Sequence, residues 1–110
     1  MFIGIGRVEI FLPGLSSLKS KRRIIKSIKG KIRSKFNVSI SEIDFLDKWQ
    51  RSLIGIVAVS NDSKFLQSSF NQILNQLQEF RDINILDWNI KINNDFETEK
   101  GKFLYNENSP

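Results

Sequence analysis

The chain has 110 residues, of which 40% are hydrophobic and 26% charged, a balance typical of one folded domain and not of a disordered chain. It contains neither cysteine nor histidine, which excludes disulfides, thiolate and imidazole metal ligands, and nucleophile pairs that need either residue. The formal net charge of +5 favours anionic partners.

The amino-terminal residues 1–12 are apolar but do not have the pattern of a secretory signal. Arg7 and Glu9 interrupt them, and no basic segment precedes them. The uncharged apolar run 52–61 is about half as long as a membrane-spanning helix requires. The sequence therefore predicts a cytoplasmic protein.

The first two predicted elements are a strand and a helix. Residues 2–12 are mostly β-branched or aromatic and predict a strand that ends at the turn pair Pro13-Gly14. Ser16 or Ser17 then caps a helix. The apolar residues of this helix recur at helical spacing: Leu18, Ile25, Ile28, Ile32 and Phe36.

Residues 37–45 and 51–60 predict two further strands, joined by a hairpin connection at 46–49. The first alternates like an edge strand, whereas the second is almost continuously apolar, like a central strand. Residues 61–63 offer caps for a second helix. Its buried stripe is Leu66, Phe70, Ile73, Leu77 and Phe80. The last strand, 83–92, changes the phase of its apolar residues, which indicates a local irregularity.

This order of elements predicts an α+β ferredoxin-like fold, a βαββαβ sandwich with a four-stranded antiparallel sheet and two helices on one face. The first and third strands should be central. We expect the domain to span residues 1–92. Residues 93–110 are rich in asparagine, glutamate and lysine and predict a loose polar tail. Three apolar residues of that tail are candidates for docking on the domain: Phe103, Leu104 and Tyr105.

Both central strands carry apolar residues on both sides, which predicts a cover for the sheet face that lacks helices. If Val8, Ile10 and Leu12 face the helices, we expect the open face to hold Ile3, Ile5 and Phe11 together with Ile54, Ile56 and Ala58. A second subunit or the tail could cover this face. The sequence thus favours a homodimer through the open sheet face.

The positive charge is concentrated in the first predicted helix. Nine of the 17 basic residues lie between 19 and 35, and no acidic residue occurs between Glu9 and Glu42. At about 100° per residue, four of them form one row beside the apolar stripe. We call this row the basic ridge: Arg22, Lys26, Lys29 and Arg33. Like charges at this spacing repel one another, so helix stability alone does not favour them.

The basic ridge predicts binding to RNA or to a ribosomal particle, without a cofactor or a metal ion. Its length of about 16 Å is enough to touch several backbone phosphates. The predicted RNA-binding residues are Lys19, Arg22, Arg23, Lys26, Lys29 and Arg33. The alternative is that the ridge is a solvated face, which acids elsewhere on the domain neutralise or which serves only solubility. The protein would then be a homodimeric interaction module without a nucleic-acid role.

The turn before the first helix offers a candidate anion site. Backbone amides and the hydroxyls of Ser16 and Ser17 could hold a phosphate near Lys21. Helix capping explains the two serines equally well. The spacing of a P-loop is absent.

Trp49 and Arg51 share the hairpin between the middle strands. A tryptophan beside an arginine can stack on a nucleic-acid base. The alternative is that Trp49 covers the core.

Catalysis is not expected. Acids such as Asp44, Asp47 and Asp62 are scattered, and no pair has the spacing of a general acid and base. The glycine, glutamine and arginine signature of acylphosphatases, which bind phosphate on the same fold, is absent. Of the predicted functions, a phosphate-binding enzyme is therefore the least favoured.

Five ordered segments resemble the YlxP-like family of small bacterial proteins. They are Leu12-Pro13-Gly14, residues 17–23, residues 36–39, Trp49-Gln50-Arg51 and residues 59–62. The resemblance covers about residues 1–92. It implies a ferredoxin-like fold and no established biochemical function. The genes of the family often lie near those of translation initiation and ribosome maturation factors, which implies a link with ribosomal RNA.

Overall fold

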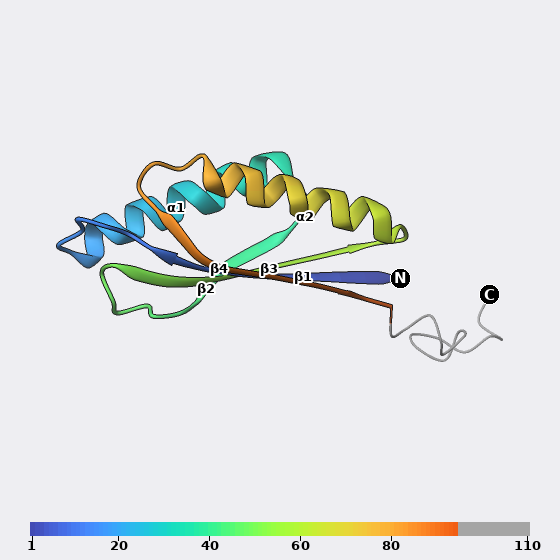
Figure 1. The fold of residues 1–110 in the computed structure, drawn as a ribbon, viewed down its shortest axis with the longest axis horizontal. Coiled ribbons are helices and arrows are strands. Elements are labelled where there is room, and N and C mark those ends of the chain that lie inside the picture. Colours follow the sequence, from blue (N-terminus) through green and yellow to red (C-terminus); the bar gives the residue numbers. More distant parts are fainter. Residues whose placement is uncertain (95–110) are drawn as a thin grey trace, which may run out of the picture.

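The computed structural model describes residues 1–94, so the predicted tail after Asn94, with Phe103, Leu104 and Tyr105, lies outside the described residues. The elements are β1 (Phe2–Phe11), α1 (Leu18–Lys35), β2 (Ser39–Asp44), β3 (Arg51–Ser60), α2 (Ser63–Gln78) and β4 (Asn84–Asn93). The strands form one antiparallel sheet in the order β2-β3-β1-β4. Figure 1 shows both helices on one face of it. The α+β ferredoxin-like fold is confirmed, with β1 and β3 central.

Both helices begin at residues that the sequence predicted as N-caps. The Ser17 hydroxyl accepts a hydrogen bond from the Ser20 N–H at 3.1 Å, and the Asp62 carboxylate accepts from the N–H of Lys64 at 2.9 Å. Each helix then buries one stripe against the sheet. The buried apolar residues of the two helices are Ile25, Ile28, Ile32, Leu66, Phe70, Ile73 and Leu77.

Two glycines in β1 allow α2 to lie close to the middle of the sheet. A Cβ atom on Gly4 or Gly6 would lie 2.5 or 2.8 Å from a ring carbon of Phe70, so the ring occupies the space that side chains would need. Trp88 packs beside Phe70, with the ring centroids 6.4 Å apart. The core therefore depends on the absence of side chains at these two positions.

The predicted irregularity in the last strand is a register shift in β4. Glu9 pairs with Asp87 and Ile10 with Ile85, which leaves Leu86 as an extra residue. The shift lets Ile85 and Trp88 both contact the core although they are three residues apart. A second shift, in β2, leaves Ile43 as an extra residue between Glu42 and Asp44.

The prediction for the open sheet face was wrong for β3. Ile54, Ile56 and Ala58 lie opposite residues of β1 that face the helices, and so they face the helices themselves. The open face instead carries Leu53, Gly55, Val57 and Val59, together with Ile3, Ile5 and Phe11 of β1. A nearly continuous apolar strand has no alternation that fixes its phase, so the pairing register alone decides the face.

Candidate nucleic-acid interface

The four residues of the basic ridge lie along one groove between α1 and β2. The groove has a volume of about 500 Å³. Its walls are Arg22, Ile25, Lys26, Lys29, Gly30, Arg33 and Glu42. Gly30 keeps one side of it open, since apart from its chain neighbours and the backbone of its own helix no atom lies within 4 Å of where its Cβ would be. The row predicted from helical spacing is thus a row in the fold as well.

The charge of the ridge is not balanced within residues 1–94. In this part of the chain, Arg22, Lys26 and Lys29 form neither a hydrogen bond nor an ion pair through their side chains. Arg33 donates to the carbonyl oxygen of Ile40 at 3.0 Å, which satisfies an acceptor of the edge strand β2. Three cations therefore face the groove without a partner among the described residues.

The acid in the groove wall, Glu42, is already engaged. Its carboxylate lies 2.7 Å from the ammonium nitrogen of Lys21 and accepts a hydrogen bond of 2.7 Å from the Ser52 hydroxyl. Lys21 is only 1% exposed, and it also donates to the carbonyl oxygen of Phe45. The charge of Glu42 is therefore compensated by Lys21 and does not pair with the cations of the ridge.

The predicted anion site is not built as expected, because its three residues serve different purposes. The Ser17 hydroxyl caps α1 and also donates to the Ser20 hydroxyl at 3.0 Å. Lys21 points into the interior and is bound there by Glu42. Ser16 lies instead in the wall of a pocket at the β2–β3 hairpin.

The other basic residues of α1 lie outside the groove. Lys19 and Arg23 are exposed on the solvent side of the helix. Lys31 and Lys35 lie on the flank toward α2, where Lys31 is 5.3 Å from the ring centroid of Phe80 and Lys35 donates to Gln76 at 3.2 Å. The predicted RNA-binding set therefore divides into a groove-lining row and two outward-facing cations.

The loop after β1 and the β2–β3 hairpin meet at one end of the sheet (Figure 1). The N–H of Leu12 donates to the carbonyl of Gln50 at 2.8 Å, and the side-chain amide of Gln50 donates to the carbonyl of Leu15 at 3.3 Å. Between them lies a pocket of about 630 Å³, which we call the hairpin pocket. Its walls are Phe11, Leu15, Ser16, Phe45, Asp47, Lys48, Trp49, Gln50 and Arg51.

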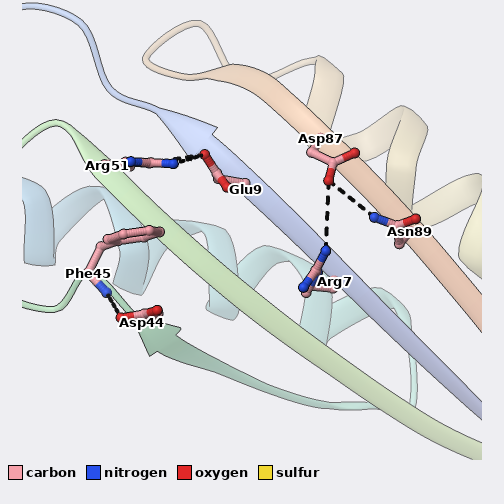
Figure 2. Close-up of polar contacts among 7 residues, drawn as sticks. All are labelled: Arg7, Glu9, Asp44, Phe45, Arg51, Asp87 and Asn89. Carbon is pink, nitrogen blue, oxygen red and sulfur yellow. Dashed lines mark hydrogen bonds and ion pairs between the residues drawn. The ribbon is translucent and has the colours of Figure 1, made fainter.

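Trp49 and Arg51, the predicted stacking pair, both line the hairpin pocket. Trp49 is 50% exposed, so it does not act as a cover for the core. Arg51 donates to one carboxylate oxygen of Glu9 through Nε at 3.0 Å and Nη2 at 2.7 Å. Figure 2 shows the two side chains facing each other. The guanidinium carbon of Arg51 lies 4.2 Å from the ring centroid of Phe45. Sequence reasoning found neither partner, because the contact with Glu9 depends on the pairing of β3 with β1 and the contact with Phe45 on the shape of the hairpin.

Within residues 1–94 no three acidic side chains gather closely enough to hold a metal ion. None of the helices described has the length and apolar composition needed to cross a membrane.

Comparison with known proteins places the chain in a family. Residues 3–90 match the model of a family described as "Protein of unknown function (DUF503)". The chain is 38% identical over 81 residues to the uncharacterized protein YlxP of Bacillus subtilis strain 168, covering 74% of this chain and 88% of the relative. These two matches agree with the resemblance in the sequence.

A solved structure gives a weaker match. It is LarC2, the C-terminal domain of a cyclometallase involved in the synthesis of the NPN cofactor of lactate racemase, in its apo form. The alignment covers 84% of this chain and 56% of that chain at 8% identity, with a TM-score of 0.37, and carries no argument about function. On the family model and the Bacillus relative, the chain belongs to the DUF503 family, the family of YlxP.

Proposed function

We propose that this protein is a cytoplasmic accessory factor of translation or ribosome maturation that binds ribosomal RNA, free or in a ribosomal particle, through the basic ridge. Its role is binding without catalysis. The phosphates of a structured RNA would lie along the groove between α1 and β2. Lysine and arginine on a helix flank supply charge but few groups that read bases, so sequence preference should be modest.

The observation that carries the proposal is the set of unpaired cations at Arg22, Lys26 and Lys29. A solvated face balanced by nearby acids would require acidic partners within the domain. Glu42, in the groove wall, is held by Lys21 and Ser52 instead. A row of cations that mutually repel is stabilised when an external polyanion lies across it.

We expect the unmodified protein to bind 16S or 23S ribosomal RNA fragments at low salt and to release them at high salt, because counterion release dominates phosphate binding. Fluorescence anisotropy with labelled fragments over a salt series measures this directly. Cosedimentation with ribosomal particles in lysate extends it to the assembled target. No binding to either at low salt would overturn the proposal and leave the ridge as a solvated face.

A second candidate function is self-association through the open sheet face. The apolar side chains exposed there are Ile5 at 42%, Ile43 at 54%, Val57 at 42% and Val59 at 61%. Three of them, Ile5, Ile43 and Val57, line a hollow of about 310 Å³ at Gly55. The patch ends at ion pairs of Arg7 with Asp87 and of Arg51 with Glu9 (Figure 2). A second copy of the chain, which carries the same mixture of apolar and paired charged groups, would bury this patch.

For this dimer we expect light scattering to give twice the monomer mass at tens of micromolar protein. Replacing both Val57 and Val59 by arginine should give the monomer, because like charges would then face each other across the two-fold axis. Phe65→Arg is the control, since Phe65 is 61% exposed but lies on α2. A monomeric mass of the unmodified chain would remove the dimer.

A further inference from the structure

We propose that the hairpin pocket binds one unpaired base of the RNA whose phosphates lie on the basic ridge. The inference rests on the proposed function and makes it more specific: the target would be a structured RNA with a bulged or looped-out nucleotide.

The shape and lining of the pocket suit a flat aromatic ring. Phe11, Phe45 and Trp49 contribute three rings to its walls, and Leu15 adds an aliphatic side chain. Half of the Trp49 surface is open, which leaves ring area for stacking. The volume of about 630 Å³ is within the range of small-molecule sites.

The wall at Phe45 is held in place by several contacts. Phe45 has a φ of 61°, a left-handed conformation that is uncommon for a residue with a large side chain. Three hydrogen bonds hold it there. The Asp44 carboxylate accepts from its N–H at 2.7 Å, and its carbonyl accepts from the N–H of Lys48 at 3.0 Å and from the ammonium of Lys21. Arg51, fixed by Glu9, then lies over the ring. A preformed wall lowers the entropic cost of binding.

The charge of the pocket favours a base over a phosphate. The positive charge of Arg51 is already paired with Glu9, and the remaining wall charges are one cation, Lys48, and one anion, Asp47. A backbone phosphate, which carries one negative charge, would gain little here. An uncharged base loses less on leaving water than a charged phosphate does, and it gains the stacking contacts.

Lys21 links the wall of the pocket to the wall of the groove. The ammonium of Lys21 binds both Glu42, in the wall of the groove, and the carbonyl of Phe45, in the wall of the pocket. An RNA strand that follows the ridge toward the start of α1 therefore reaches the end of β2 where the pocket opens. One flipped nucleotide there would place its base among the rings.

The fluorescence of Trp49 can report whether the hairpin pocket is occupied. The second tryptophan, Trp88, packs against Phe70 in the core, so Trp88→Phe gives a full-length chain whose emission comes from Trp49. The probes are an RNA stem with one bulged adenosine and the same stem fully paired. We expect the bulged stem to quench Trp49 emission and the paired stem to leave it unchanged.

Substitutions then assign the effect to stacking. Trp49→Ala should weaken binding of the bulged stem on the order of tenfold and leave the paired stem within about twofold, and Trp49→Phe should retain most of the affinity. The control is Leu46→Ala, because Leu46 is 58% exposed on the same hairpin but does not line the pocket.

The outcomes separate this inference from the proposed function. Equal binding of the two stems, with Trp49 emission unchanged, would overturn the base pocket while leaving the ridge as an RNA site. Binding of neither stem would overturn both. A response of Trp49 to a leucine-rich peptide, with none to either RNA, would assign the pocket to a protein partner.

Discussion

Replacing Arg22, Lys26 and Lys29 together by glutamine is expected to flatten the slope of log affinity for ribosomal RNA against log salt by roughly 2 to 3 units. At 0.1 M salt this corresponds to a loss of affinity on the order of a hundredfold. Glutamine keeps a long polar side chain and removes only the charge. Arg33 is left unchanged because its guanidinium binds the Ile40 carbonyl, so its loss would also disturb β2. Anisotropy titrations at four or five salt concentrations give the slope.

The matched control replaces Lys64, Arg81 and Lys91 by glutamine. It removes the same number of lysines and arginines from exposed positions outside the groove, so both variants have the same net charge. If the groove positions the phosphates, the control should retain most of the salt slope. Equal flattening in both variants would mean that the net charge of the protein, and not the ridge, attracts RNA.

The elements and the ridge could be predicted because their signals are local. Helical spacing places Arg22, Lys26 and Lys29 on one flank whatever the rest of the chain does, and the phase change between Ile85 and Trp88 marks the bulge in β4. The faces of β3 could not be predicted in the same way. Its run from Leu53 to Val59 is apolar on both sides, so only pairing with β1 shows which residues face the helices.

The sequence contains a signal for the buried ion pair of Lys21 with Glu42. Counting Lys21 among the basic residues of α1 concealed it. Lys21 precedes Ile25 by four residues and Ile28 by seven, which places it on the buried stripe of α1. Glu42 follows the buried Ile40 by two residues, on the same face of β2. Both positions lie on faces that are buried in the core. Two opposite charges at such positions are expected to form an ion pair. The walls of the hairpin pocket carried no such signal, because they depend on the left-handed Phe45 and on contacts between distant segments.

Lys21→Met is expected to lower the free energy of unfolding by about 2 to 4 kcal/mol, because it leaves Glu42 with its charge in a mostly buried site. The Glu42 side chain is 16% exposed, which places the cost somewhat below that of a fully buried pair. The Phe45 carbonyl would also lose one of its donors. Urea denaturation with an unchanged m value measures the difference. The control is Lys26→Met on the same helix, an exposed position where the change should stay within about 0.5 kcal/mol.

Adding Glu42→Gln to Lys21→Met should recover part of the lost stability, because an uncharged amide oxygen can still accept from the Ser52 hydroxyl. The same pair of variants tests the link to the ridge. With Lys21 gone, the free carboxylate of Glu42 faces the groove and should weaken RNA binding, and Glu42→Gln should restore it. If Lys21→Met costs no more stability than Lys26→Met, the pair behaves like a surface ion pair. If it costs stability but leaves RNA affinity unchanged, Lys21 supports the fold without shielding the ridge from Glu42.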